Sequence, residues 1–196
     1  PNFGIDAESF RTGLRSALTR MLQIDTGAPA GPPLDTADAT NVARLIDFLV
    51  VAIPPAAAVL ATITNVINLW LAARVVKFSG RLTRPWPQLS ELTFPRMVVA
   101  VFAVAMGLSF SGGMVGIVAN VLSAALLMAY GVLGFSVLHA LTRGVNSRAF
   151  VLGGVYAAVM VFGWPVLALC VLGLLETAID LRARIARKRG PPAPTR

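Results

Sequence analysis

The sequence predicts an all-α fold, a polytopic transmembrane helical bundle preceded by an N-terminal amphipathic helix. Hydrophobic residues make up 56% of the 196 residues and charged residues only 13%, whereas about a quarter of a soluble domain is charged. No charged side chain occurs from Val98 to Leu138, a stretch about twice the roughly 20 residues that one helix needs to cross a bilayer. We therefore expect one membrane domain of four or five spans over residues 41–181.

Residues 1–40 are expected to form an amphipathic helix and a linker. Apolar residues recur at helical spacing between Asp6 and Leu22, while Arg11 and Arg15 fall on another face. Such a helix either lies on a membrane surface or packs against the protein's own loops. Glycine and proline then interrupt regular structure between Asp25 and Thr40, which indicates a linker.

The expected spans cover about residues 48–73, 96–110, 114–141, 149–163 and 165–180, followed by a basic tail at 182–196. Pro54 and Pro55 predict a kink or short break in the first span, because proline removes an N–H and crowds the preceding turn. Asp180 and Arg184 lie four residues apart, which predicts a helical ion pair where the tail continues the last helix.

The last apolar stretch forms either one long helix or two short spans that turn at Gly163-Trp164-Pro165. With five spans, thirteen of the seventeen Lys and Arg residues lie on one side of the membrane; with four spans the split is seven against ten. Basic residues concentrate in cytoplasmic loops. The charge distribution therefore favours five spans and a cytoplasmic C-terminus, although each half of the stretch is short for a full crossing.

Four polar side chains within the expected spans are candidates for lining a solute site: Asn65, Asn68, Asn120 and Tyr130. Polar groups inside a membrane cost free energy, so each is a functional candidate. Asn65 and Asn68 share one helix face, and Asn120 begins a polar stripe that Tyr130 extends. Hydrogen bonding between helices is the commoner use of such residues and stays open as the alternative.

Three ionisable residues are candidates for proton coupling: Glu176, Asp180 and His139. The two carboxylates lie one turn apart at the end of the last span, where structural pairing with nearby arginines is the alternative. The histidine lies at the basic end of the third span and can titrate near neutral pH. An ordinary interfacial hydrogen bond is its alternative role.

Composition and motifs argue against several other classes of function. The chain has one cysteine and one histidine, so neither an internal disulfide nor a Cys/His zinc cluster is possible, and we expect no metal or other cofactor. No nucleophile–base motif or phosphate loop is present, so we expect no catalytic residues and no enzyme. The net charge of +8 suits contact with anionic membrane lipid, and we expect no nucleic-acid partner.

Three blocks of sequence resemble a known family. They are residues 68–74 with 79–82 and 84–87, residues 134–144, and residues 163–165 with 172–176 and 180–182. Their order and spacing are similar to the YybS-like family of uncharacterised bacterial predicted membrane proteins. The resemblance covers about residues 43–184 and implies a multi-pass protein of the bacterial inner membrane, of which this chain is expected to be a C-terminal part. The family's hydropathy pattern is also similar to that of substrate-binding membrane subunits of vitamin transporters.

Two functions follow as hypotheses. In the first, the protein binds or translocates a small solute. In the second, it is a non-catalytic accessory or scaffold subunit that contacts other membrane protein subunits. A single cavity that collects the polar faces would favour the first hypothesis, and polar residues at separate helix contacts would favour the second.

Overall fold

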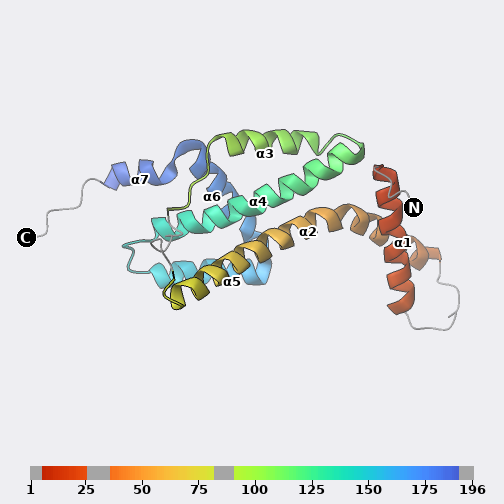
Figure 1. Cartoon of the computed structure of the whole chain (residues 1–196), viewed down its shortest axis with the longest axis horizontal. Coiled ribbons are helices and arrows are strands. Elements are labelled where there is room, and N and C mark those ends of the chain that lie inside the picture. The colour runs from red at the N-terminus through yellow and green to blue at the C-terminus, as the bar shows by residue number, and fades with distance from the viewer. Residues whose placement is uncertain (1–5, 26–35, 82–90, 190–196) are drawn as a thin grey trace, which may run out of the picture. The chain divides into compact units, whose positions relative to one another are not determined.

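The computed structural model describes residues 6–25, 36–81 and 91–189, and every regular element in these ranges is a helix (Figure 1). The predicted all-α fold is therefore confirmed. In chain order the helices are α1 (Ala7–Asp25), α2 (Thr36–Phe78), α3 (Met97–Leu108), α4 (Gly113–Leu141), α5 (Arg148–Phe162), α6 (Pro165–Ile179) and α7 (Leu181–Arg189). The centre of the expected linker, part of the basic connection after α2 and the end of the tail lie outside the described residues.

Two of the described helices are long and apolar enough to cross a membrane by length and composition. These are α4 and the segment Thr40–Phe78 of α2. The other apolar helices, α3, α5 and α6, have between 10 and 17 residues, which is fewer than the roughly 20 that a full crossing needs. The five-span arrangement therefore stays a prediction.

The chain divides into two compact units, which we describe separately. The first unit comprises Pro1–Ala61 and Ala105–Ala124, so it holds α1, the first half of α2 and the first part of α4. The second unit comprises Thr62–Val104 and Ala125–Arg196, so it holds most of α3, the rest of α4 and all of α5 to α7.

Helix α2 runs without interruption through Pro54 and Pro55, so the predicted short break is absent and the helix bends in the orange part of its ribbon (Figure 1). The expected linker boundary is wrong. Helix α2 begins at Thr36, so residues 36–40 are helical and do not belong to the linker. The reason is local: residues 36–53 contain no glycine or proline, and the hydrogen bonds on either side of the two prolines keep the helix intact.

The predicted break at Gly163-Trp164-Pro165 is confirmed. Helix α5 ends at Phe162 and α6 begins at Pro165, where the missing N–H of proline costs nothing in a first turn. Gly163 has φ +70°, a left-handed conformation that favours glycine, and its N–H donates to the carbonyl oxygen of Val159 at 2.9 Å.

The predicted Asp180–Arg184 ion pair is wrong. Asp180 adopts a left-handed conformation, with φ 50° and ψ 60°, which ends α6 before α7 begins. Its carboxylate contacts the guanidinium of Arg96 at 2.7 Å, and Arg184 donates its Nε–H to the carbonyl of Ile179 at 2.7 Å. The helical spacing persists, since the N–H of Arg184 donates to the carbonyl of Asp180 at 3.0 Å. The ion pair is absent because each side chain has another partner.

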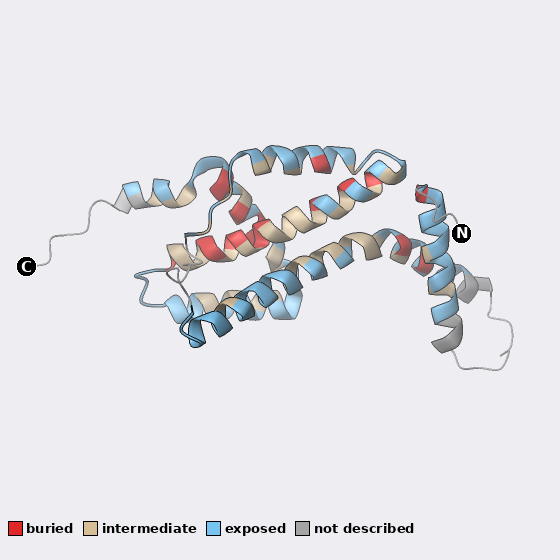
Figure 2. Cartoon of the chain, in the orientation of Figure 1, coloured by how far each residue is buried: buried red, intermediate tan, exposed pale blue. Residues whose placement is uncertain are grey.

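The core of the second unit lies on α4, around the fully buried side chains of Tyr130, Leu133 and Val137 (Figure 2). The rings of Phe94 and Phe102 meet the Tyr130 ring edge-on, with centroids 5.6 and 5.7 Å away. This arrangement is the one that ring quadrupoles prefer.

Glycine lets the backbones of α4 and α6 approach closely within the second unit. A Cβ atom on Gly134 of α4 would collide with the carbonyl oxygen of Leu169 on α6. Reciprocally, a Cβ on Gly173 of α6 would collide with the carbonyl oxygen of Tyr130 on α4. Small residues commonly mediate close helix packing in membrane proteins, and here they appear on both partners.

Candidate functional site

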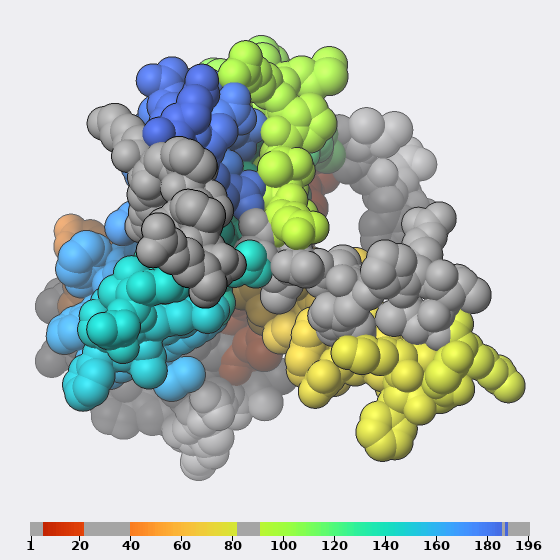
Figure 3. Space-filling view, turned by 90° about the vertical axis from the view of Figure 1, so that its left-hand side faces the viewer, coloured from red at the N-terminus to blue at the C-terminus, as the bar shows by residue number. Residues whose placement is uncertain are grey.

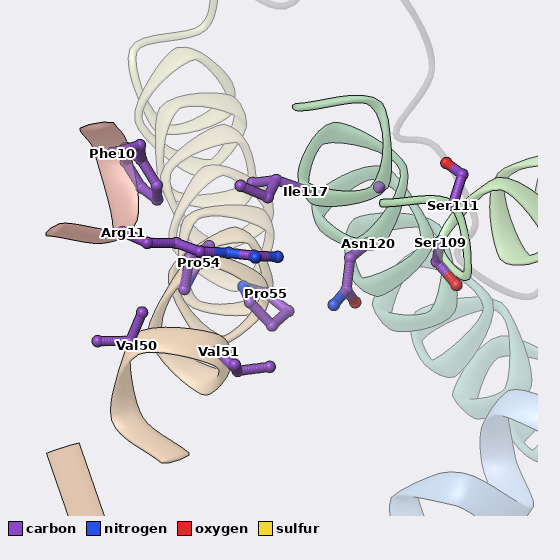
Figure 4. A pocket seen from close by; sticks show the side chains of 11 residues that line it. Phe10, Arg11, Val50, Val51, Pro54, Pro55, Ser109, Ser111, Ile117 and Asn120 are labelled. Carbon is purple, nitrogen blue, oxygen red and sulfur yellow. The ribbon is translucent and has the colours of Figure 1, made fainter. Parts of the chain in front are cut away.

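A cavity of about 150 Å³ lies within the first unit (Figure 4). Helix α1 contributes Phe10 and Arg11, and the start of α4 contributes Ile117 and Asn120. Gly116 of α4 also lines it. The remaining lining residues come from α2 and from the segment after α3: Val50, Val51, Pro54, Pro55, Ser109 and Ser111. The cavity thus combines an apolar wall with a small number of polar groups, as solute sites generally do.

The proline pair of α2 leaves two backbone carbonyls on this side of the cavity without helical hydrogen bonds. In an α-helix the carbonyl of residue i accepts from the N–H of residue i+4, and proline has no N–H. Pro54 and Pro55 therefore leave the carbonyls of Val50 and Val51 without their usual donors. All four residues line the cavity, so the turn of α2 that borders it contains two backbone acceptors without their helical donors.

Two side chains supply donors to the cavity. The guanidinium of Arg11 extends past Pro54 toward Pro55, and the amide of Asn120 faces the same space from α4 (Figure 4). The hydroxyls of Ser109 and Ser111 already donate to the carbonyls of Met106 and Leu108, each at 2.6 Å. The serines therefore offer only acceptor lone pairs, and Arg11 and Asn120 are the side-chain donors available.

The charges around the cavity are unevenly matched. Arg15 forms an ion pair with Asp47, which links α1 to α2. Within the described residues, Arg11 makes no such ion pair. Glu8 lies three residues before Arg11, and the two share an adjoining cavity of about 340 Å³ with Thr12 and the Arg15–Asp47 pair. Glu8 does not line the smaller cavity, whose one charged lining residue is Arg11.

The four predicted solute-lining residues are distributed over both units. Asn120 lines the cavity of the first unit. Asn65 and Asn68 are exposed on α2 within the second unit. Tyr130, also in the second unit, is fully buried in the aromatic core, and its hydroxyl has no hydrogen-bond partner among the described residues. The structure thus places one of the four in a cavity, and the roles of the others stay predictions.

The three predicted proton-coupling residues all have structural partners. Glu176 is buried and accepts from Arg182 twice, from Nε at 2.6 Å and from the backbone N–H at 3.0 Å. Asp180 pairs with Arg96 on the exposed side. The Nδ1 of His139 lies 2.9 Å from the carbonyl oxygen of Phe135, and its ring meets Tyr156 edge-on. These contacts match the structural alternatives, and proton coupling stays untested.

The Glu176–Arg182 pair also fixes the junction between α6 and α7. The side chains are only 7% and 16% exposed, and a second nitrogen of Arg182 donates to the carbonyl of Leu92 at 2.6 Å. The guanidinium thus joins the end of α6 to the segment that precedes α3. No group of three or more potential metal ligands occurs among the described residues.

Comparison with known proteins identifies a family. A family model described as a predicted membrane protein (DUF2232) matches residues 2–177. The chain belongs to the DUF2232 family. No curated protein and no solved structure matches the chain. Membership in a family of predicted membrane proteins agrees with the two helices that are long and apolar enough for a membrane crossing.

Arg11 was not predicted as a site residue of this DUF2232 member. The sequence places it on the polar face of an amphipathic helix, where arginine is common whether or not it binds a ligand. A usable signal was nonetheless present, because a Pro-Pro pair inside a helix always frees two successive carbonyls that need donors. The sequence does not show which distant side chain supplies those donors, since that depends on the packing of α1.

Proposed function

We propose that this protein is a multi-pass protein of the bacterial inner membrane that binds a small polar solute in the cavity of the first unit. The observation that carries the proposal is that Arg11, Asn120 and the helical turn with two proline-freed carbonyls line one cavity. Such groups are costly among apolar helices unless they are used. The resemblance to YybS-like proteins is compatible with DUF2232 membership and remains part of this proposal.

Co-purification of a small molecule tests solute binding. We expect that the protein, purified in native lipid particles, carries a small molecule detectable by mass spectrometry. Asn120→Leu should reduce its occupancy at least about tenfold, because losing a buried hydrogen bond to a ligand costs on the order of 1.5 kcal/mol. Asn68→Leu makes the same chemical change on an exposed face of α2 and should leave occupancy unchanged.

Each outcome of this experiment has a distinct meaning. Loss in the Asn68 variant alone would place the site in the second unit and contradict the assigned cavity. The absence of any co-purifying or added ligand that stabilises the wild-type protein would contradict solute binding altogether.

An accessory or scaffold role is the second candidate function, favoured by the exposed second half of α2. Leu69 and Phe78 are 74% and 98% exposed, and Arg74 lies over the ring of Trp70 at 5.2 Å. The end of this helix, in yellow, is open to the surroundings in the space-filling view (Figure 3). Under this alternative, other membrane subunits would cover α2, and co-purifying proteins would replace the small molecule.

The orientation in the membrane follows from the charge distribution and is also a proposal. We expect Ser79→Cys and Ser147→Cys, in a Cys170→Ala background, to be protected from an impermeant maleimide added to intact cells. Ser16→Cys should react, because the sparsely charged N-terminal side faces outward under the positive-inside rule. All three positions are exposed on the protein itself. Labelling of the first two with protection of the third would reverse the orientation.

A further inference from the structure

We propose that the cavity of the first unit binds an anionic group, a carboxylate or a phosphate, with Arg11 as its counter-charge. This inference rests on the proposed solute-binding function and names the class of ligand. Among the residues that line the cavity, Arg11 is the only charged one. The nearby Arg15 and Asp47 compensate each other as an ion pair. Glu8 shares only the adjoining cavity with Arg11 and forms no ion pair with it.

The α2 side of the cavity brings unpaired acceptors near the guanidinium. The carbonyls of Val50 and Val51 lack their helical donors because of Pro54 and Pro55, and Arg11 lies beside the two prolines (Figure 4). A guanidinium has five N–H donors in a planar fork, so one edge can donate to carbonyl acceptors while the other donates to an oxyanion. Such carbonyls are uncharged and would leave the net charge of the arginine available to a ligand.

The α4 side of the cavity adds a second donor. Asn120 contributes an amide that can donate to an oxyanion. The arginine comes from α1 and the amide from α4, so a charged donor and a neutral donor reach the same cavity from two helices.

The size of the cavity restricts what fits. A volume of about 150 Å³ is room for about five water molecules at roughly 30 Å³ each, and complete ligand pockets generally measure about 300–1,000 Å³. The cavity can hold a carboxylate or phosphate group with its solvation, with the rest of a larger ligand extending outward. A soluble small acid and an acidic phospholipid headgroup both present such a group.

Binding measurements on the full chain test the assignment. The protein is reconstituted in phosphatidylcholine nanodiscs, and its thermal unfolding is followed with inorganic phosphate, with succinate, or with phosphatidylglycerol added to the lipid. A neutral polyol serves as the uncharged probe. We expect saturable stabilisation by at least one anionic probe. Arg11→Gln should weaken its apparent affinity at least about tenfold, as expected for the loss of a charge-assisted hydrogen bond.

Arg20→Gln is the matched control, since it removes the same charge from an exposed position of the same helix that does not line the cavity. It should leave the affinity unchanged, whereas Arg11→Lys should retain part of it. Stabilisation by phosphate or succinate identifies a soluble acid as the source of the anionic group, and stabilisation by phosphatidylglycerol alone identifies a lipid headgroup. Either result supports the inference.

Two results would overturn the assignment of an anionic ligand to this cavity. Equal weakening in the Arg11 and Arg20 variants would mean a diffuse effect of α1 charge and not a site. Binding of the polyol with no response to any anion would reject the anionic class while leaving solute binding intact. The absence of any response, together with an empty co-purification experiment, would instead reject the proposed function itself.

Discussion

Glu176→Leu is expected to destabilise the protein by about 3–5 kcal/mol, because it leaves the charge of Arg182 without its counter-ion at a largely buried position. The two side chains are only 7% and 16% exposed, so solvent compensates little of the loss. The contact of Arg182 with the carbonyl of Leu92 also depends on the orientation that Glu176 imposes. Thermal unfolding in detergent measures the effect, with the reactivity of the single, buried thiol of Cys170 as reporter.

Asp180→Asn provides the matched control for this ion pair. The Asp180–Arg96 pair is 57% and 73% exposed, and exposed pairs contribute about 1 kcal/mol or less. Asparagine also tolerates the left-handed backbone at this position. The double variant Glu176→Leu/Arg182→Leu should recover most of the lost stability, since it removes both charges together. A double variant as unstable as the single one would contradict burial of an unpaired charge as the cause.

Gly134→Ala is the second substitution with a large expected effect. The added methyl group would meet the backbone of Leu169 on α6, and backbone cannot move aside as the end of a flexible side chain can. Overpacking of this kind typically costs about 1–3 kcal/mol, occasionally more. We therefore expect a lower unfolding temperature and faster alkylation of Cys170, which lies on α6 next to this contact.

Alanine substitutions at two other glycines serve as controls for Gly134→Ala. Gly154→Ala on α5 has open space around the added methyl group, and alanine should stabilise the helix there by up to about 1 kcal/mol. Gly131→Ala should be milder than Gly134→Ala, because its Cβ would lie 3.2 Å from the Sγ of Cys170, a side chain that can shift. Similar stability of all three variants would show that close backbone contact does not hold α4 and α6 together.

The elements of the fold were largely predictable because their signals are local. A proline in a first turn after a glycine identified the start of α6, and the uncharged stretch from Val98 identified α3 and α4. The start of α2 was misplaced, because apolar content was used to find the span and the preceding residues are helical but more polar. The Asp180–Arg184 pair failed because the carboxylate of Asp180 contacts Arg96, a residue far away in the sequence that helical spacing does not reveal.

The candidate site was less predictable, because its parts come from segments far apart in the sequence. Asn120 could be identified, since an amide in an apolar helix is conspicuous. Arg11 could not, because its role depends on how α1 packs against the first half of α2. Gly134 and Gly173 were overlooked for the same reason: a glycine in an apolar helix becomes informative only when its neighbour across the contact is known.

Helix α2 is longer than the hydrocarbon core of a bilayer is thick. Its 43 residues extend over about 65 Å at 1.5 Å per residue, about twice the roughly 30 Å of a hydrocarbon core. Residues 56–78, after the proline pair, account for about 35 Å, close to one bilayer thickness. Where residues 56–78 span the hydrocarbon core, hydrophobic matching along this helix couples bilayer thickness to the depth of the wall formed by Val50 to Pro55. The same protein in a thicker or thinner membrane would carry that wall at a different level.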